Sequence, residues 1–448
     1  MCMNIVLGGI LLYRVVVIGG GWSGCAAALS ARKAGADVVL LEKTDLLLGL
    51  GNVGGIMRNN GRFTAAEENV AMGAHELFEI TDRCSRHVNI DFPGHQHASL
   101  YDVTKVEPCV RRLLREKGVD IRLMARAVDV VVRKRDMSDG KIAKESIIEK
   151  IVLAGGEEVE GDVFVETTGS TGPMGNCLTY GNGCCMCILR CPAFGPRVSI
   201  SAKAGGSDIM GKRKDGSFGA FSGSGKLEKQ SLSEELQHKL NETGVAVVPL
   251  PEKAIKREKL DMKVCKQYAL NEYAENIILL DTGYAKIMTP FFDLDTLRQI
   301  PGFENARYAD PYAGGKGNSI RYLSVAERDN GMKASGIENL FCGGEKSGLF
   351  VGHTEAISTG SLAGHNAVRY LKGMKPLELP VGIAVGDLIT FANENLATED
   401  GLMTRYTFAG AEYFNRMKDK GLYSVDRDEI AGRVKRYGLE NIYGERMI

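Results

Sequence analysis

The chain has 448 residues, a formal net charge of zero, 44% hydrophobic residues and 25% charged residues. This length indicates two or three domains, and the balanced charge argues against a strong non-specific nucleic-acid binder. Residues 1–12 make a poor signal peptide because Gly8 and Gly9 interrupt the apolar run, and no run is long enough to cross a bilayer. We therefore expect a cytoplasmic protein with no membrane partner.

The stretch Arg14–Lys43 has the pattern of a dinucleotide-binding βαβ unit. Val15–Ile18 form an apolar run typical of a strand buried on both faces. Three glycines with the spacing G-x-G-x-x-G follow it: Gly19, Gly21 and Gly24. In such a turn the first glycine permits the bend, the second admits a pyrophosphate, and the third lets helix and strand pack closely. Glu42 ends the next predicted strand, where a carboxylate accepts hydrogen bonds from ribose hydroxyls. An ordinary glycine-rich turn is the alternative interpretation.

Loops, helices and strands alternate after this unit. Leu46–Gly55 is a second glycine-rich loop, which either approaches the dinucleotide or is only a turn. Two helices and two strand regions are expected next: Thr64–His87, Val103–Glu116, Ile121–Lys134 and Ser146–Phe164. The last strand leads into Thr168 and Gly169, which would bring the chain back under the dinucleotide. His95 and His97 are expected in a solvated loop rather than at a metal.

Residues 171–335 break the βαβ rhythm, and we expect them to form an inserted substrate domain. Five of the 11 cysteines fall within Cys177–Cys191, and three of them give C-x2-C-x3-C-P, as in the last part of the bacterial ferredoxin run. We expect four thiolates to hold a [4Fe-4S] cluster and Cys185 to be spare. The four are Cys177, Cys184, Cys187 and Cys191. A zinc site, a redox dithiol and a set of buried small residues stay open as alternatives.

The first pattern resumes after Asn339. Leu340–Cys342 is a predicted strand, and Thr354–Leu371 is a predicted helix whose N-terminus presents backbone N–H groups to a phosphate or a similar acceptor. Residues 376–448 are expected to be a helical region. The sequence thus predicts an α/β fold with a Rossmann-like domain built from two segments, 1–170 and 336–375, on either side of the inserted domain.

The chain contains two glycine-rich anchors that are far apart in the sequence, Gly19–Gly24 and Gly343–Glu345. In this arrangement it resembles the glutathione-reductase type of FAD protein. Within that class the chain resembles the GidA/TrmFO group of folate-dependent flavoproteins that modify tRNA uridine. The resemblance is carried by Ile300–Ala306 (IPGFENA), Gly343–Ala367 and the proline-led run Leu379–Leu388. There are three departures. TrmFO members resemble one another in a nucleophilic cysteine soon after the second strand, whereas residues 42–83 here contain no cysteine. Glu345 stands where a Gln or Asp is usual, and the cysteine cluster is not part of the group's pattern.

The anchors and the resemblance together imply a set of residues that contact FAD. These are Gly19, Gly21, Ser23, Gly24, Glu42, Lys43, Gly54, Gly55, Val128, Thr168, Gly169, Gly343, Gly344, Glu345 and His353. No catalytic residue is identifiable. NAD(P)H is a candidate electron donor, although no second G-x-G-x-x-G is visible.

The predicted function is that of an FAD-dependent oxidoreductase, which passes electrons between a cysteine-bound iron–sulfur cluster and the flavin. One alternative is a methylenetetrahydrofolate-dependent RNA uridine methyltransferase of TrmFO type, and another is a non-catalytic, flavin-containing partner subunit. We expect a small-molecule or redox-protein substrate and do not favour RNA. The sequence does not indicate an oligomeric state.

Overall fold

The computed structural model describes residues 6–7, 10–11, 13–136, 142–169, 195, 197–212, 216, 220–222, 225–260, 266–288, 292–309, 319–321 and 324–448. The predicted iron–sulfur ligands and Cys185 lie outside these residues. The predicted division into segments 1–170, 171–335, 336–375 and 376–448 stays a prediction. None of the helices in the described part of the chain combines the length and the apolar character that crossing a membrane requires.

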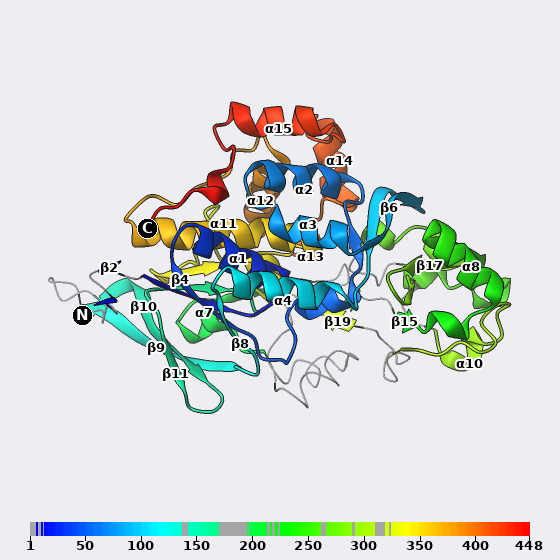
Figure 1. Cartoon of the computed structure of the whole chain (residues 1–448), viewed down its shortest axis with the longest axis horizontal. Helices are drawn as coiled ribbons and strands as arrows, with labels where there is room; N and C mark the ends of the chain where they lie inside the picture. Colours follow the sequence, from blue (N-terminus) through cyan, green and yellow to red (C-terminus); the bar gives the residue numbers. More distant parts are fainter. Residues whose placement is uncertain are drawn as a thin grey trace.

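A five-stranded parallel sheet in the order β21-β12-β3-β4-β8 forms the centre of the larger lobe (Figure 1). Its strands are β3 (Arg14–Ile18), β4 (Asp37–Leu41), β8 (Asp120–Arg122), β12 (Val163–Glu166) and β21 (Leu340–Cys342). Val15 pairs with Val38 on one side and Val163 on the other, and Phe164 pairs with Leu340. Strands from both ends of the chain therefore share one sheet, and the predicted α/β class with a parallel sheet is confirmed.

The sheet is covered on both faces, which explains its continuous apolar strands. Val15 and Val17 point to a core shared with α1 (Trp22–Lys33) and α11 (His353–Leu371), and the alternate residues Val16 and Ile18 point to a second core. That second core is closed by an antiparallel sheet of β9 (Ala127–Asp136), β10 (Ile142–Leu153) and β11 (Glu158–Glu160). Figure 1 shows the helices and the antiparallel strands on opposite sides of the central sheet.

Three further helices extend the helical layer: α2 (Gly61–Ala71), α3 (Glu76–Arg83) and α4 (Val106–Glu116). The single helix expected over Thr64–His87 is instead two helices followed by a strand. Gly73, which lies between them, has φ +92°, a left-handed conformation that ends a helix. The backbone therefore breaks the helix where the apolar pattern alone predicted that it would continue.

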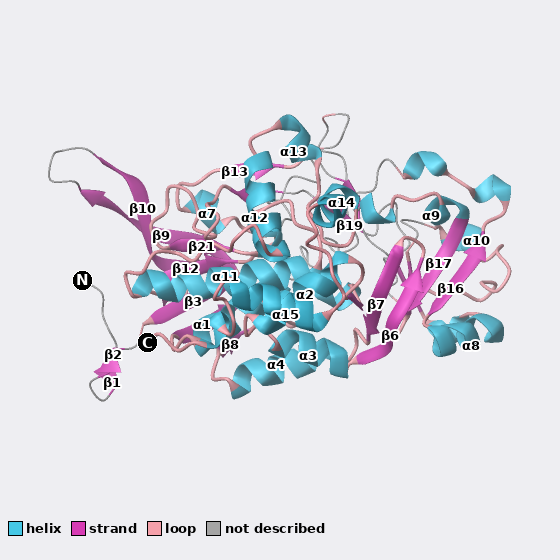
Figure 2. Cartoon of the chain, turned by 90° about the horizontal axis from the view of Figure 1, so that it is seen from above, coloured by secondary structure: helices cyan, strands magenta, loops and turns pink. Residues whose placement is uncertain are grey.

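A second lobe is built on antiparallel strands and is visible at the right of Figure 2. One sheet has the order β15-β18-β17-β16, and a neighbouring sheet has the order β5-β7-β6. Their strands are β15 (Gly225–Leu227), β16 (Val245–Pro249), β17 (Asn276–Asp281), β18 (Ala285–Ile287), β5 (Ile56–Met57), β6 (Ser85–Phe92) and β7 (His95–Tyr101). Leu100 from β7 and Ile278 from β17 lie in one buried cluster, so the two sheets share a core.

The remaining helices and strands of the described residues are short. They are β1 (Val6–Leu7), β2 (Ile10–Leu11), α7 (Ile200–Lys203), β13 (Asp208–Met210), β14 (Ala220–Ser222), α8 (Glu234–Thr243), α9 (Glu272–Glu275), α10 (Leu294–Leu297), β19 (Ser319–Arg321) and β20 (Ser324–Ala326). Among the 3-10 turns are η1 (Gly49–Val53), η6 (Gly344–Ser347) and η7 (Ile442–Gly444).

The C-terminal region is helical, as predicted, and lies over α2 and α11 (Figure 1). Its helices are α12 (Ala384–Asn395), α13 (Glu399–Met403), α14 (Ala411–Asp419) and α15 (Arg427–Arg436). Glu68 of α2 is fully buried, and its carboxylate accepts the backbone N–H groups of Ala384 and Val385 at 2.8 and 2.9 Å. Burial raises the pKa of Glu68 to about 7, despite these hydrogen bonds and the nearby Arg433.

Candidate nucleotide-binding site

The three glycines of the first anchor have different surroundings. Gly19 has φ +105°, and a Cβ there would lie 2.5 Å from the carbonyl oxygen of Thr167. A Cβ on Gly24 would lie 1.8 Å from the carbonyl oxygen of Gly19. By contrast, a Cβ on Gly21 would have no neighbouring atom of the described residues within 4 Å. Gly19 and Gly24 are thus required by the fold, whereas Gly21 borders open space at the start of α1, which fits a pyrophosphate.

Glu42 lies at the end of β4, next to the first anchor. One carboxylate oxygen accepts the backbone N–H of Gly20 at 2.7 Å, and the other accepts the backbone N–H and the hydroxyl of Thr44, both at 2.9 Å. These bonds fix the carboxylate, which is 6% exposed. A carboxylate oxygen has more than one acceptor direction, so these contacts are compatible with the predicted bond to ribose.

The second anchor packs directly on the first. A Cβ on Gly343 would lie 2.6 Å from the hydroxyl of Ser23, and a Cβ on Gly360 of α11 would lie 2.2 Å from the carbonyl oxygen of Ser23. Gly344 has φ +67°, and its N–H donates to the hydroxyl of Thr359 at 2.8 Å. The buried Ser23 hydroxyl has no hydrogen-bond partner in the described residues. An unsatisfied hydroxyl in the first turn of α1 fits an anionic ligand group.

The second glycine-rich loop also reaches this site. The N–H of Leu48 donates to the carbonyl of Gly20 at 2.7 Å, so the two loops touch. A Cβ on Gly54 would lie 1.8 Å from the ring of His353, which begins α11. The hydroxyl of Tyr101 lies 3.3 Å from Nδ1 of His353 and donates to the carbonyl of Gly51 at 3.0 Å. The structure thus brings Gly54 and His353 together.

The other predicted residues lie on several different elements. Lys43 donates to the carbonyl of Gly195 at 2.9 Å. Thr168 donates to Glu166 at 2.9 Å and accepts from Arg197 at 3.2 Å. The remaining members are Gly55 (φ +83°), half-buried Val128 at the start of β9, Gly169 (φ +81°) and half-buried Glu345 in η6. Their roles toward FAD stay predictions.

A buried polar cluster beside the second anchor escaped the sequence analysis. Glu166, at the end of β12, accepts the backbone N–H groups of Ile200 and Ser201, both at 2.8 Å. Lys346 is fully buried; its ammonium group donates to Ser199 at 2.8 Å, contacts Asp208 and lies 4.0 Å from Glu166. The cluster fixes α7 to the edge of the sheet. The only available signal was a lysine next to the glycine pair.

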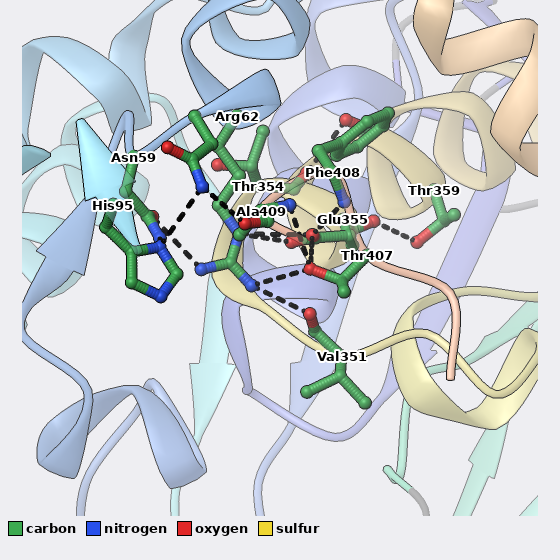
Figure 3. A network of polar contacts seen from close by, with 12 residues as sticks. Asn59, Arg62, His95, Val351, Thr354, Glu355, Thr359, Thr407, Phe408 and Ala409 are labelled. Carbon is green, nitrogen blue, oxygen red and sulfur yellow. Dashed lines mark hydrogen bonds and ion pairs between the residues drawn. The ribbon is translucent and has the colours of Figure 1, made fainter. Parts of the chain in front are cut away.

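A second buried network holds the start of α11 (Figure 3). Glu355 is fully buried and accepts from Nε of Arg62 at 3.1 Å, from the hydroxyl of Thr407 at 2.8 Å and from the backbone N–H of Phe408 at 2.9 Å. Arg62 also donates to the carbonyl of Val351 at 2.8 Å. Residues from α2, α11 and the segment before α14 therefore meet at one carboxylate.

The same network includes His95, which is 2% exposed rather than solvated as expected. Asn59 donates to Nδ1 of His95 at 2.9 Å, and Nε2 lies 3.1 Å from the carbonyl oxygen of Gln267. Burial and the charge of Arg62 lower the pKa of His95 to about 3, so the ring is neutral. A neutral imidazole with both nitrogens engaged indicates a structural role.

Metal binding finds no support in the described part of the chain. That part contains no group of three or more His, Cys, Asp or Glu side chains placed to hold an ion, and its cysteines are Cys25, Cys84, Cys109 and Cys342, all unbridged. The predicted iron–sulfur ligands are outside the described residues, so that site stays a prediction.

Comparison with known proteins identifies the family. The model for "Glucose inhibited division protein A" matches residues 14–280 and 282–375, most of the chain. The chain belongs to this family. A GidA structure from Aquifex aeolicus covers 95% of this chain and 76% of its own, with a TM-score of 0.62 and 16% identity, and thus shares the fold.

Two curated relatives match shorter stretches. The tRNA uridine 5-carboxymethylaminomethyl modification enzyme MnmG of Thermus thermophilus is 32% identical over 117 residues, covering 24% of this chain and 18% of the relative. The methylenetetrahydrofolate–tRNA-(uracil-5-)-methyltransferase TrmFO of Caldicellulosiruptor bescii is 34% identical over 94 residues, covering 21% of each. The matched stretches therefore span about a fifth of the length of these relatives.

These relatives correct one expectation. We expected a small-molecule or redox-protein substrate and did not favour RNA, and this is wrong, because both relatives are named as enzymes that modify tRNA. The expectation relied on the balanced net charge and on the missing TrmFO-type cysteine. Net charge is an average over the chain and does not describe one surface. The resemblance to the GidA/TrmFO group is confirmed by the family match.

Proposed function

We propose that this protein is an FAD-dependent enzyme that substitutes the C5 position of a uridine in tRNA. The family match over most of residues 14–375 is the observation that carries the proposal. The names of the two relatives differ in the group that is added but share the 5-position of uridine. The proposal is therefore limited to that shared target.

The glycine anchors and Glu42 are the residues that would hold FAD. The open space at Gly21 and the unsatisfied Ser23 hydroxyl suit the pyrophosphate, and Glu42 suits the ribose. The second anchor and the N-terminus of α11, where Tyr101 contacts His353, suit the other half of the cofactor. When bound, FAD supplies the redox chemistry, while these side chains bind and orient it. Among the residues that the structure describes, we assign none to taking or giving a proton.

A tritium-release assay tests the proposed target without assuming the added group. Substitution at C5 removes the hydrogen of that carbon, so tRNA labelled with [5-³H]uridine should release tritium into water. The mixture would contain the protein, FAD, NADH, methylenetetrahydrofolate and glycine, which supply hydride, one-carbon and amine groups. The matched control is tRNA labelled with [6-³H]uridine, which should keep its label. Release from neither substrate by FAD-loaded protein would contradict the proposal.

The cysteine-bound iron–sulfur cluster, NAD(P)H as electron donor and a non-catalytic partner subunit remain separate predictions. The comparisons with known proteins support modification of tRNA, and they do not support electron transfer through an iron–sulfur cluster. A stable protein partner in pull-downs, together with a reducible flavin and no tritium release, would favour the partner subunit instead.

A further inference from the structure

A buried arginine holds the segment that leads from the second anchor to α11. Arg328 follows β20 by two positions and is 3% exposed. Its Nε donates to the carbonyl of Ser347, the last residue of η6, at 2.8 Å. Its Cζ lies 5.7 Å from the centre of the Phe350 ring, in a cation–π contact. Arg328 therefore contacts both ends of residues 347–350, although it is not among the residues predicted to contact FAD.

The other hydrogen bonds of Arg328 also go to backbone carbonyls. Nη1 donates to the carbonyl of Asp329 at 3.1 Å, and Nη2 donates to the carbonyl of Ile389 in α12 at 3.3 Å. In the part of the chain that the structure describes, no carboxylate forms an ion pair with this guanidinium. Burial lowers the pKa of Arg328 to about 10 and the nearby Asp329 opposes this shift, so the group is charged at neutral pH. Asp329 is exposed, and water screens its charge.

Two other buried cations near the second anchor are paired with carboxylates. Arg62 binds Glu355 at the start of α11 (Figure 3), and Lys346 of η6 contacts Asp208. Arg328 differs from both, because it brings a positive charge to the same region without a buried carboxylate to neutralise it. An unpaired buried cation destabilises a protein unless another interaction offsets the cost. Such a departure from ordinary packing is expected where the charge acts on a ligand.

We propose that Arg328 is a positioning residue that raises the reduction potential of FAD bound at the second anchor. This inference rests on the proposed function, in which the second anchor and the start of α11 hold FAD. Reduction adds two electrons and one proton to the neutral flavin ring and leaves it with one negative charge. A buried positive charge is screened little by salt, so it stabilises the reduced ring more than the oxidised ring. The protein therefore binds reduced FAD more tightly than oxidised FAD.

A redox titration of the full chain loaded with FAD tests this preference. The protein would be reduced stepwise with dithionite beside a dye of known potential, and absorbance would report both. Arg328→Gln removes the charge and keeps hydrogen-bond donors, whereas Arg328→Lys keeps the charge. We expect Arg328→Gln to lower the preference for reduced over oxidised FAD at least about tenfold, which is about 30 mV for a two-electron couple. Arg328→Lys should lose less than Arg328→Gln.

A second buried arginine provides the matched control. Arg433 of α15 is 5% exposed, and its guanidinium lies 3.0 Å from Glu429 and also donates to the carbonyl of Leu422. Its contacts thus lie in the C-terminal region, and its charge is paired. Arg433→Gln should leave the potential of FAD unchanged. Urea unfolding of each apoprotein measures the structural cost of the variants separately from the potential.

The outcomes separate the charge of Arg328 from a purely structural role. A smaller fall than tenfold in Arg328→Gln overturns the inference, and so does a fall in Arg328→Lys as large as in Arg328→Gln. If the variants do not fold, the wild type decides: a potential above that of free FAD supports the inference, and a potential at or below it overturns the inference. Protein that takes up no FAD would overturn the proposed function as well, whereas bound FAD with an unaffected potential overturns this inference alone.

Discussion

Replacing Gly21 by alanine separates binding of the cofactor from folding of the site. Gly21 has φ −65° and ψ −178°, which an alanine adopts without strain, and its Cβ would lie more than 4 Å from the neighbouring side chains and backbone that the structure describes. A glycine-to-alanine change in a compatible conformation stabilises a protein by about 0.4–1 kcal/mol, so the apoprotein should unfold at the same or slightly higher urea concentration. The new methyl group would lie in the space assigned to the pyrophosphate.

The expected effect on binding follows from this overlap. Forcing an extra methyl group into a filled space costs about 1–3 kcal/mol, which corresponds to a roughly 5- to 150-fold weaker Kd for FAD. Quenching of flavin fluorescence on titration measures the Kd, and urea unfolding followed by circular dichroism measures stability.

Two other alanine variants make the Gly21 experiment specific. Gly155→Ala places the same methyl group away from the described residues, at the turn between β10 and β11, and should leave the Kd for FAD unchanged while affecting stability no more than Gly21→Ala does. Gly24→Ala, with its Cβ 1.8 Å from the carbonyl oxygen of Gly19, should destabilise the apoprotein itself. The assignment of the pyrophosphate is refuted if Gly21→Ala binds FAD as tightly as the wild type.

Four other variants test buried groups and the cysteine cluster. Glu355→Gln leaves the Arg62 guanidinium buried without its counter-charge and should cost about 3–5 kcal/mol in urea unfolding; a loss below about 1 kcal/mol would contradict the buried pair. Burial raises the pKa of Glu68 in the folded protein to about 7. Its contribution to the free energy of unfolding is therefore present below about pH 4.3, the pKa of an unfolded glutamate, and is lost as the pH rises to about 7. Glu68→Gln should flatten that part of the stability–pH curve, and an unchanged slope would argue against the raised pKa. In anaerobically prepared protein, Cys187→Ser should lose iron and acid-labile sulfide while Cys185→Ser keeps both; wild-type protein without iron would end the iron–sulfur prediction.

The parts of the fold that could be predicted depend on local steric rules. The bend at Gly19 and the close contact at Gly24 each demand glycine, so the G-x-G-x-x-G spacing was visible in the sequence without any tertiary information. The second anchor was visible for the same reason, because Gly343 and Gly344 follow a short apolar strand. Both predictions concern residues whose neighbours in space are largely dictated by the strand-to-turn geometry around them.

The buried polar networks could not be predicted, because they depend on contacts between residues far apart in the chain. Arg62 and Glu355 are 293 positions apart, and Lys346 and Asp208 are 138 positions apart. A charged residue in a sequence is most often solvated, and only the tertiary structure shows that Lys346 and Glu355 are fully buried. The same limit explains the misplacement of His95.

The position of α11 shows why the C-terminal region matters to the site. This helix starts without a side-chain cap, after Gly352. Its first turn is instead held by Glu355, which accepts hydrogen bonds from Arg62 of α2 and from Thr407 and Phe408 of the C-terminal region. A fully buried carboxylate with three donors is costly to move, because any displacement leaves a charge or a donor unpaired in the interior. The region for which no chemistry was predicted therefore helps to fix the helix end that we assign to FAD.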